Sequence, residues 1–348
     1  MHYFPIRLRC ATVWYHHLHM DMQEQITRML GQFSWEPMLE RVDVRAAPPR
    51  KIIVCGMGGS HLAAELLARA APGPAFLIHH DYGLPPLSNT DKNGALILIS
   101  SYSGETEEAL SAFDAAQSAG VSMAVMTSGG RLLEEARTAA LPTVVLPRED
   151  IEPRMTLGYM LRGLAGLLGD ASLAARIAAV AQAVHNDRAR TTGEALANAL
   201  AGGVPVLYAS SHNASLAYIL KATFNETAKI PAFWGTVPEV CHNELSGYDF
   251  GASFAPVATQ LRPIFITDTA DHPRVQVRIA LMRTLLEERG VATSSIEVSA
   301  DNTSLAAGMQ AILIGTWAAV LLAAQYEVPN AKTPLIATFK EQLVRTPT

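Results

Sequence analysis

Short apolar runs alternate with longer amphipathic or alanine-rich segments along the first half of the chain. Each run is almost wholly apolar, which is typical of strands covered on both faces of a parallel sheet. The segments between the runs have helical composition, so the alternation predicts βαβ units. The predicted strands occupy residues 51–55, 75–79, 95–100, 122–127 and 143–146.

The same rhythm returns after residues 154–200, which are rich in Ala and Leu and predict a helical connector. Further strands are predicted at residues 205–209, 232–234, 263–267 and 295–298. Helices are predicted at 22–42, 61–71, 214–229, 275–289 and 335–343. The pattern indicates an α/β protein with two doubly wound parallel-sheet domains, each a three-layer αβα structure. The expected divisions are 1–42 (N-terminal extension and helix), 43–153 (first sheet domain), 154–203 (connector) and 204–348 (second sheet domain with a C-terminal tail).

One uncharged stretch, residues 305–326, has the length of a membrane-spanning helix. Gln310, Thr316 and Gln325, many Ala and Gly, and the lack of a flanking Lys or Arg cluster favour a buried helix instead. The first 20 residues lack the apolar core of a signal peptide, so we interpret them as an extension. We therefore expect no membrane partner.

Composition and charge narrow the function classes. The chain has 348 residues, 49% of them hydrophobic and 17% charged, which is typical of a folded globular protein. A net charge of −5 argues against a nucleic-acid binder that depends on a broad basic surface. Cys10, Cys55 and Cys241 stand far apart and predict no disulfide framework, so we expect a cytoplasmic protein.

The first segment with chemistry is GMGGS at residues 56–60, directly after a predicted strand and before a helix. Glycines let the backbone approach an anion, and a helix N-terminus offers free N–H groups, so Gly59 and Ser60 are candidate phosphate-binding residues. A dinucleotide fingerprint would have Gly or Ala where this chain has His61. Asp81, at a suitable distance for a ribose contact, keeps a nicotinamide-dependent enzyme as an alternative.

A second loop, SSYSGET at residues 100–106, follows the third predicted strand. The hydroxyls of Ser101, Ser103 and Thr106 can converge with the backbone N–H groups of the turn on the oxygens of a phosphate monoester. The alternative is that Ser103 and Thr106 only cap a helix with glutamates in its first turn. Because this loop is predicted to lie beside GMGGS, the pair favours an anion site.

The second half carries a candidate acid–base pair. Glu226 lies on a predicted helix in the segment FNETAK, and His242 follows in PEVCHNE. A carboxylate and an imidazole suit proton transfer between carbon atoms and oxygen atoms of a sugar. Taken singly, Glu226 would be a surface carboxylate that pairs with Lys229 or with nothing, and His242 an ordinary loop residue.

GMGGS followed by SYSGETEE resembles the sugar isomerase (SIS) family of phosphosugar-binding domains, and within it the bifunctional phosphoglucose/phosphomannose isomerases. The resemblance extends from about residue 22 to the C-terminus and includes the Asn-Glu and His-Asn-Glu motifs at the family's spacing. It implies two SIS domains and a homodimer. It also implies that Glu226 is the proton-transfer base and that His242 opens the sugar ring from across the subunit interface.

Three more assignments come from the resemblance alone. Arg154, in the segment EPRMTLGYM, matches the residue that stabilises the enediolate intermediate. Lys340 matches the residue that works with His242 on the ring oxygen, and Thr333 matches the hydroxyl that helps the site accept the mannose epimer. Two positions depart from the family pattern, since His61 replaces a glycine and Cys241 stands where an Asn often precedes the histidine. Both departures bear on substrate preference.

The resemblance implies an isomerase that interconverts glucose 6-phosphate, and mannose 6-phosphate, with fructose 6-phosphate through a cis-enediol. It implies no cofactor and no metal. The histidines agree, since His16-His17 and His79-His80 are adjacent pairs and no HExxH motif occurs. Two alternatives besides the nicotinamide enzyme stay open: a non-catalytic sugar-phosphate sensor with the same fold, and an isomerase of another phosphosugar.

Overall fold

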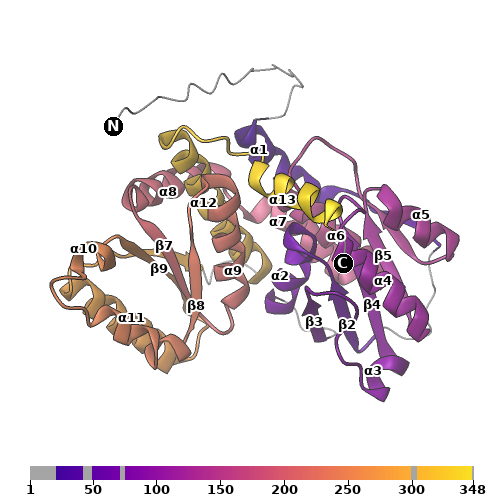
Figure 1. Ribbon diagram of the computed structural model, residues 1–348, viewed down its shortest axis with the longest axis horizontal. Helices are drawn as coiled ribbons and strands as arrows, with labels where there is room; N and C mark the ends of the chain where they lie inside the picture. The colour runs from indigo at the N-terminus through magenta and orange to yellow at the C-terminus, as the bar shows by residue number, and fades with distance from the viewer. Residues whose placement is uncertain (1–20, 42–48, 71–74, 299–303, 347–348) are drawn as a thin grey trace, which may run out of the picture.

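The computed structural model describes residues 21–41, 49–70, 75–298 and 304–346. The expected N-terminal extension, residues 1–20 with Cys10, lies outside these described residues. Two sheets lie side by side, and the helices α9 and α12 stand between the second sheet and the first (Figure 1).

The first sheet has six strands in the order β1-β6-β5-β4-β2-β3. Every neighbouring pair is parallel except β1 with β6. The strands are β1 (Met38–Glu40), β2 (Lys51–Cys55), β3 (Ala75–His79), β4 (Ala95–Ser101), β5 (Met123–Thr127) and β6 (Thr143–Val145). The helices around them are α1 (Met22–Gly31), α2 (Leu62–Ala70), α3 (Asn89–Gly94), α4 (Glu107–Ala119) and α5 (Gly130–Thr138).

Three helices then connect the sheets: α6 (Leu157–Leu168), α7 (Ala171–Ala183) and α8 (Asn186–Leu200). The second sheet has four parallel strands in the order β10-β9-β7-β8. Its strands are β7 (Val204–Ser210), β8 (Phe233–Val237), β9 (Leu261–Asp268) and β10 (Ser294–Val298). Its helices are α9 (Ala214–Thr223), α10 (Ala255–Ala258), α11 (Pro273–Glu288), α12 (Ser304–Gln325) and α13 (Pro334–Arg345).

Both faces of each sheet are covered, as the continuous apolar runs predicted. Successive residues of β2 show this division, because Ile52 and Val54 join one buried cluster while Ile53 and Cys55 join another on the opposite face. The first of these clusters is the central core, which includes side chains of α1, α2, α6 and α12 and one face of the second sheet. The two sheets therefore share one continuous core, and α/β layers built on parallel sheets are confirmed.

The long apolar helix is a core element. α12 is long and apolar enough to cross a membrane, but 89% of its most apolar window is buried inside the protein. It packs mainly against α8, and also against α9 and α2. The prediction of a buried helix is therefore confirmed.

The helix expected to run to about Lys229 does so, but its last turn, Phe224–Ala228 (η4), is π-helical. Two other predictions about the elements were wrong. The helix expected over residues 22–42 ends in a 3-10 turn at Ser34, since Pro37 disfavours a helical residue before it, and β1 follows. The two halves are also less alike than expected, because the second sheet has four strands and the first has six. The residue boundaries of the two domains stay predictions.

Candidate active site

The loops after β2 and β4 lie where the chain reverses its direction across the first sheet. β3 lies on one side of β2 and β4 on the other, so the carboxyl ends of β2 and β4 flank the crevice in which α/β sheets bind ligands. The residues predicted to bind phosphate lie at this end of the two strands: Ser101 is the last residue of β4, and Gly59, Ser60, Ser103 and Thr106 lie in the segments that follow the strands.

Hydrogen bonds join the two loops at Ser60, which is buried. Its Oγ accepts from the backbone N–H of Tyr102 at 3.1 Å, and its carbonyl accepts from Ser100 Oγ at 2.6 Å. Gly59 contacts a third segment, because a Cβ at this position would lie 2.7 Å from the carbonyl carbon of Pro153. Only glycine lets the loop of residues 56–60, here called the phosphate loop, approach the Pro153–Arg154 backbone this closely.

The hydroxyls after β4 point to an anion site better than to helix capping alone. Ser101 Oγ lies 2.9 Å from Thr106 Oγ1 and accepts from the N–H of Gly104 at 3.1 Å. Thr106 precedes α4 without making a side-chain capping hydrogen bond, so the N–H groups at the start of α4 stay available. Ser103 is exposed, and its Oγ accepts from the N–H of Glu105 at 3.2 Å. Hydroxyls and free N–H groups thus gather at one helix N-terminus.

The side chain of Arg154 connects the first sheet to the second half of the chain. Its guanidinium lies 3.2 Å from the carboxylates of both Glu152 and Glu226. It also donates to Thr227 Oγ1 at 3.1 Å and to the carbonyls of Asn330 and Ala331 at 2.9 and 3.0 Å. Only 5% of the Arg154 side chain is exposed, so its guanidinium is largely shielded from water, while the Glu152 and Glu226 carboxylates are partly exposed.

Glu226 occupies the π-helical turn that ends α9, and such turns occur frequently at functional sites. Its carboxylate pairs with Arg154, while the ammonium of Lys229 donates to its backbone carbonyl. Lys229 itself has a left-handed backbone (φ +58°), which ends the helix at this point. Glu226 is therefore not a surface carboxylate paired with Lys229, which was the alternative from sequence.

Burial sets the electrostatics around this pair. Burial raises the pKa of Glu152, and Arg154 opposes that rise. Burial lowers the pKa of Lys229, and the positive charge of Arg154 adds to the effect. Two cations and two carboxylates thus share a largely enclosed region. Because the local dielectric constant is low there, these groups interact strongly with charge on a bound ligand.

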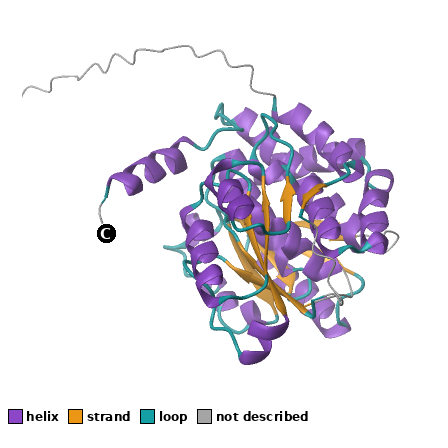
Figure 2. Ribbon diagram, turned by 90° about the vertical axis from the view of Figure 1, so that its right-hand side faces the viewer, coloured by secondary structure: helices purple, strands orange, loops and turns teal. Residues whose placement is uncertain are grey.

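His242 and Lys340 do not reach this region within one chain. His242 is exposed in the turn after η5 (Glu239–Cys241). Lys340 lies on α13, which has no buried residue and extends away from the body of the protein (Figure 2). Thr333 immediately precedes α13 and lies two residues after the Ala331 carbonyl that Arg154 binds. The structure thus brings together the loops, Arg154 and Glu226, with Thr333 nearby.

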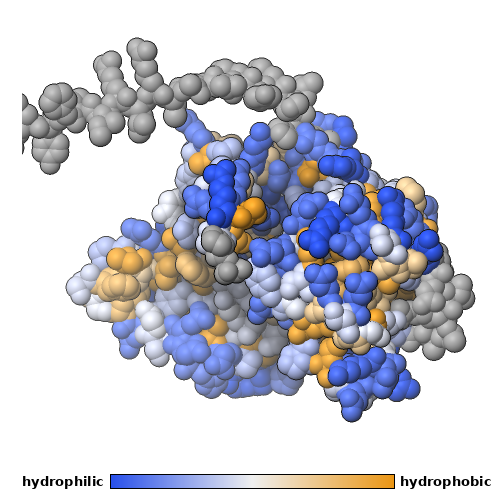
Figure 3. All heavy atoms as spheres, turned by 45° about the vertical axis from the view of Figure 1, so that its right-hand side comes forward, coloured by the Kyte–Doolittle hydropathy of each residue, from blue (hydrophilic) through white to orange (hydrophobic). Residues whose placement is uncertain are grey.

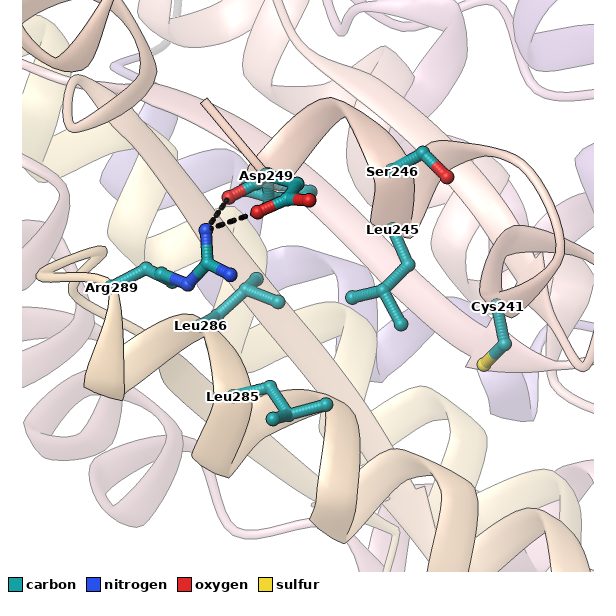
Figure 4. Close-up of a pocket in the computed structure, with 8 residues that line it drawn as sticks. Cys241, Leu245, Ser246, Asp249, Leu285, Leu286 and Arg289 are labelled. Carbon is teal, nitrogen blue, oxygen red and sulfur yellow. Dashed lines mark hydrogen bonds and ion pairs between the residues drawn. The ribbon is translucent and has the colours of Figure 1, made fainter. Parts of the chain in front are cut away.

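A cavity of about 280 Å³ lies beside the His242 turn, between that turn and α11 (Figure 4). Its lining includes Cys241, Leu245 and Leu285, and an ion pair of 2.7 Å between Asp249 and Arg289 crosses one end. None of the predicted catalytic or phosphate-binding residues lines it. This cavity is separate from the Arg154–Glu226 region.

The structure adds residues that the sequence reasoning did not assign. Glu152 and Lys229 stood in the quoted motifs without a role, and both face Arg154 or Glu226. Each is a charged residue within two or three positions of an assigned residue, and that closeness in the sequence was the signal that could have identified it. Thr227 and the carbonyls before Thr333 gave no signal, because only the folded chain places them against Arg154. In the part of the chain that the structure describes, no group of three or more His, Cys, Asp or Glu residues could hold a metal ion.

Comparison with known proteins gives one consistent result. Residues 189–343 match the family described as the bacterial phospho-glucose isomerase C-terminal SIS domain. The chain is 30% identical to a bifunctional phosphoglucose/phosphomannose isomerase of Aquifex aeolicus, over 93% of this chain and 98% of the relative. It is 29% identical to a D-glucosamine-6-phosphate 4-epimerase of Sulfolobus acidocaldarius, over 64% and 74% of the two chains.

Solved structures agree on the fold. A putative phosphosugar isomerase from Clostridium difficile superimposes with a TM-score of 0.61 at 12% identity, covering 90% of this chain and 95% of that one. At such low identity the likeness concerns the fold alone. It confirms that this chain has the α/β architecture of phosphosugar isomerases.

Proposed function

The chain belongs to the family of bifunctional phosphoglucose/phosphomannose isomerases, and from that membership we propose that it interconverts glucose 6-phosphate and mannose 6-phosphate with fructose 6-phosphate. The observation that supports this most directly is the Arg154–Glu226 ion pair of 3.2 Å. The phosphate loop adjoins it, because Gly59 packs against the backbone of Pro153 and Arg154. The proposed phosphate anchor therefore adjoins the Arg154–Glu226 ion pair.

In the proposed mechanism, the sugar phosphate binds with its anion on Gly59, Ser60, Ser101, Ser103 and Thr106. The N-terminus of α4 and the hydroxyls donate to the phosphate oxygens. His242 and Lys340 then open the sugar ring by moving a proton on the ring oxygen, a task for groups that titrate or donate near neutral pH.

Proton transfer follows on the open chain. The Glu226 carboxylate removes the proton from C2 of the aldose and returns it to C1 of the resulting enediol, which gives the ketose. Negative charge develops on the oxygen at C1 or C2 during this step, and Arg154, fixed by its other bonds, stabilises it. Thr333 lies near the same region and is the proposed contact that lets the mannose epimer bind.

Turnover of fructose 6-phosphate by the purified protein tests the activity. Glucose 6-phosphate formation is followed with a coupled dehydrogenase, and mannose 6-phosphate is supplied as substrate in a parallel reaction. We expect both sugars to be converted without added metal. Conversion of glucose 6-phosphate alone would remove the mannose activity, and conversion of neither would contradict the proposed function.

We further propose that the enzyme works as a homodimer in which the partner subunit supplies His242. Within one chain, His242 is exposed in the turn after η5, and no described hydrogen bond or ion pair joins its side chain to Arg154 or Glu226. Hydrophobic residues are exposed at several places on the side of the molecule shown in Figure 3, and the helix α13, which carries Lys340, has exposed apolar side chains of its own. The exposed apolar residues of α13 are Leu335, Ile336, Phe339, Leu343 and Val344. A second subunit would cover them and complete the site.

Mixing two inactive variants tests the shared site. In a mixed dimer, one subunit carries His242→Ala and the other carries Glu226→Gln. One of its two sites then combines the native Glu226 of the first subunit with the native His242 of the second. Co-expression should therefore restore about a quarter of the wild-type turnover, because about half of the dimers are mixed and each has one complete site. No recovery in a population shown to contain mixed dimers would contradict a shared site.

A second substrate class is favoured by one of the comparisons. The Sulfolobus relative is named for an epimerisation of glucosamine 6-phosphate. Glucosamine 6-phosphate therefore belongs in the same assay, with product identified by NMR. Turnover of this sugar in preference to fructose 6-phosphate would replace the proposed substrates and leave the family assignment intact.

We propose the cytoplasm as the compartment. The two cysteines in the described residues, Cys55 and Cys241, are both free thiols. Burial raises the pKa of Cys55 to about 12, so its thiol stays protonated and inert at neutral pH.

A further inference from the structure

A buried aromatic and histidine cluster joins the phosphate loop to the helix that carries Glu226. His61, the residue after Ser60, is only 1% exposed. Its ring lies against Tyr218 on α9, with ring centroids 5.6 Å apart, and stacks on His80 at 5.9 Å. Tyr218 in turn contacts Trp234 of β8 edge-on at 6.1 Å. None of these residues has a role in the mechanism above.

The contacts of His61 set the direction of the Tyr218 hydroxyl. Tyr218 Oη lies 3.4 Å from His61 Nε2, whereas His61 Nδ1 has no hydrogen-bond partner and lies 3.8 Å from Glu65 Oε1. Burial, together with the charge of His80, lowers the pKa of His61 to about 4, so the ring is neutral at pH 7. The Glu65 carboxylate favours the proton on Nδ1, which leaves Nε2 to accept the Tyr218 O–H. The lone pairs of the Tyr218 oxygen are then free for another donor.

Tyr218 and Glu226 lie on the same side of their helix. They are eight residues apart, but the π turn contains one extra residue, so the separation amounts to about two helical turns. Burial raises the pKa of Tyr218, and the charges of Glu65 and Glu226 add to that rise. The hydroxyl therefore lies within the electrostatic influence of the proposed base and next to the residue that ends the phosphate loop.

We propose that Tyr218 is a sugar-binding residue that accepts a hydrogen bond from a hydroxyl of the substrate carbon chain, and that His61 positions it. This proposal rests on the proposed function, which puts the sugar phosphate between the two loops and Glu226. Tyr218 contacts His61, which follows the first loop, and it precedes Glu226 on the same side of the helix. Tyr218 touches the substrate in this arrangement, and His61 acts through Tyr218.

Binding of two probes tests the proposal without requiring turnover. Sorbitol 6-phosphate, which has the carbon chain and the phosphate, and inorganic phosphate, which has only the anion, are titrated by calorimetry. We expect Tyr218→Phe and His61→Phe each to weaken sorbitol 6-phosphate binding by about tenfold, the effect of one hydrogen bond. Binding of inorganic phosphate should stay unchanged. The double variant should be no weaker than either single variant, and His61→Gln, which restores an acceptor, should recover the affinity.

The matched control is Tyr159→Phe, because its hydroxyl binds Glu149 at the surface. Equal loss of inorganic phosphate binding in Tyr218→Phe would overturn the proposal, since the change would then be structural. Unchanged sorbitol 6-phosphate binding in Tyr218→Phe, or additive losses in the double variant, would also overturn it. If wild-type protein binds sorbitol 6-phosphate through Tyr218 but isomerises no sugar, the proposed function fails and this proposal survives. No binding of sorbitol 6-phosphate to wild type would overturn both.

Discussion

The two sheets differ at the edge where their parallel strands end, here called the first edge for the first sheet and the second edge for the second sheet. At the first sheet, glycines and hydroxyls follow β2 and β4 and leave a helix N-terminus available. At the second sheet, the corresponding point lies between β7 and β9, because β8 and β9 lie on opposite sides of β7. There the protein's own side chains fill the crevice, and Arg69 reaches in from α2 of the first half.

The bonds at the second edge form a closed network. Arg69 donates to Asn213 Oδ1 at 2.6 Å and to Asp268 Oδ2 at 3.2 Å. Ser210 Oγ donates to Asp271 at 2.5 Å, and Asn213 also donates to both aspartates. All five side chains are buried. Two carboxylates at this edge would repel a phosphate. The position that is proposed to bind ligand in the first sheet therefore fastens the two halves together in the second.

Glu226→Gln should show that the first edge serves catalysis and not folding. We expect turnover of fructose 6-phosphate to fall by about 10²–10⁴-fold, the scale for loss of a general base. Sugar-phosphate affinity and the free energy of unfolding should change little, because the amide keeps the size of the carboxylate and Arg154 keeps its other bonds. Turnover and titration calorimetry on the same preparation measure both. Near-wild-type turnover would remove Glu226 as the base.

Arg69→Leu should show the opposite at the second edge. Removing the guanidinium leaves Asp268 buried without its cation, which typically costs about 3–5 kcal/mol in the free energy of unfolding. The matched control is Arg137→Leu, whose ion pair with Glu40 is exposed and screened by solvent, so its loss should change the free energy of unfolding far less. Denaturant titration of both variants decides, and equal losses would mean that the second edge does not fasten the fold.

Ser103→Ala combined with Thr106→Ala should weaken phosphate binding at the first edge. Each substitution removes a hydroxyl that would bond to a charged ligand, so we expect the dissociation constant of inorganic phosphate to rise about tenfold or more. Ser211→Ala is the control, because this exposed serine follows β7 at the second edge. If Ser211→Ala weakened phosphate binding as much, the division between the two edges would be wrong.

Lowering the pH should change the stability of the fold in opposite directions through His61 at the first edge and Asp271 at the second edge. Burial lowers the pKa of His61 at the first edge to about 4 from 6.5, so the unfolded chain binds the proton more strongly and stability falls as pH drops through this window. Burial raises the pKa of Asp271 at the second edge, so its protonation in mild acid favours the folded state. His61→Gln cannot take up the proton. Its loss of unfolding free energy between pH 7 and pH 5 should therefore be smaller than that of wild type by about 2 kcal/mol.

Denaturant titrations at the two pH values provide this comparison. Asp271→Asn serves as the control from the second edge, and it should not reduce the acid-induced loss. An unchanged loss in His61→Gln would mean that His61 takes up its proton without cost, and the buried neutral ring would then be wrong.

Much of the fold could be predicted because parallel strands are read from continuous apolar runs. β2, β4 and β5 lie within about a residue of the predicted runs, since burial on both faces demands apolar residues throughout. β1 could not be predicted, because three residues at a sheet edge leave no periodic pattern. The π turn in Phe224–Ala228 also has no signature in the residue pattern, although it sets where Glu226 points.

The site was predicted in its parts but not in its assembly. Motifs identified Arg154 and Glu226, and the structure brings them to 3.2 Å. The bonds from Arg154 to the carbonyls of Asn330 and Ala331 join segments more than 170 residues apart, and no local pattern reports such a contact. The roles of His242 and Lys340 stay predictions, because both are exposed within one chain and the proposed site needs a second subunit to bring His242 to it.

Isomerisation in D₂O tests the central claim most directly. A base that moves a proton through an enediol exchanges it with solvent, so glucose 6-phosphate formed from fructose 6-phosphate should carry deuterium at C2, seen by proton NMR. Glu226→Gln should slow the formation of labelled product by the same factor of about 10²–10⁴. Product that forms at the wild-type rate with no deuterium at C2, or labelled product that forms at the wild-type rate in Glu226→Gln, would contradict proton transfer by Glu226.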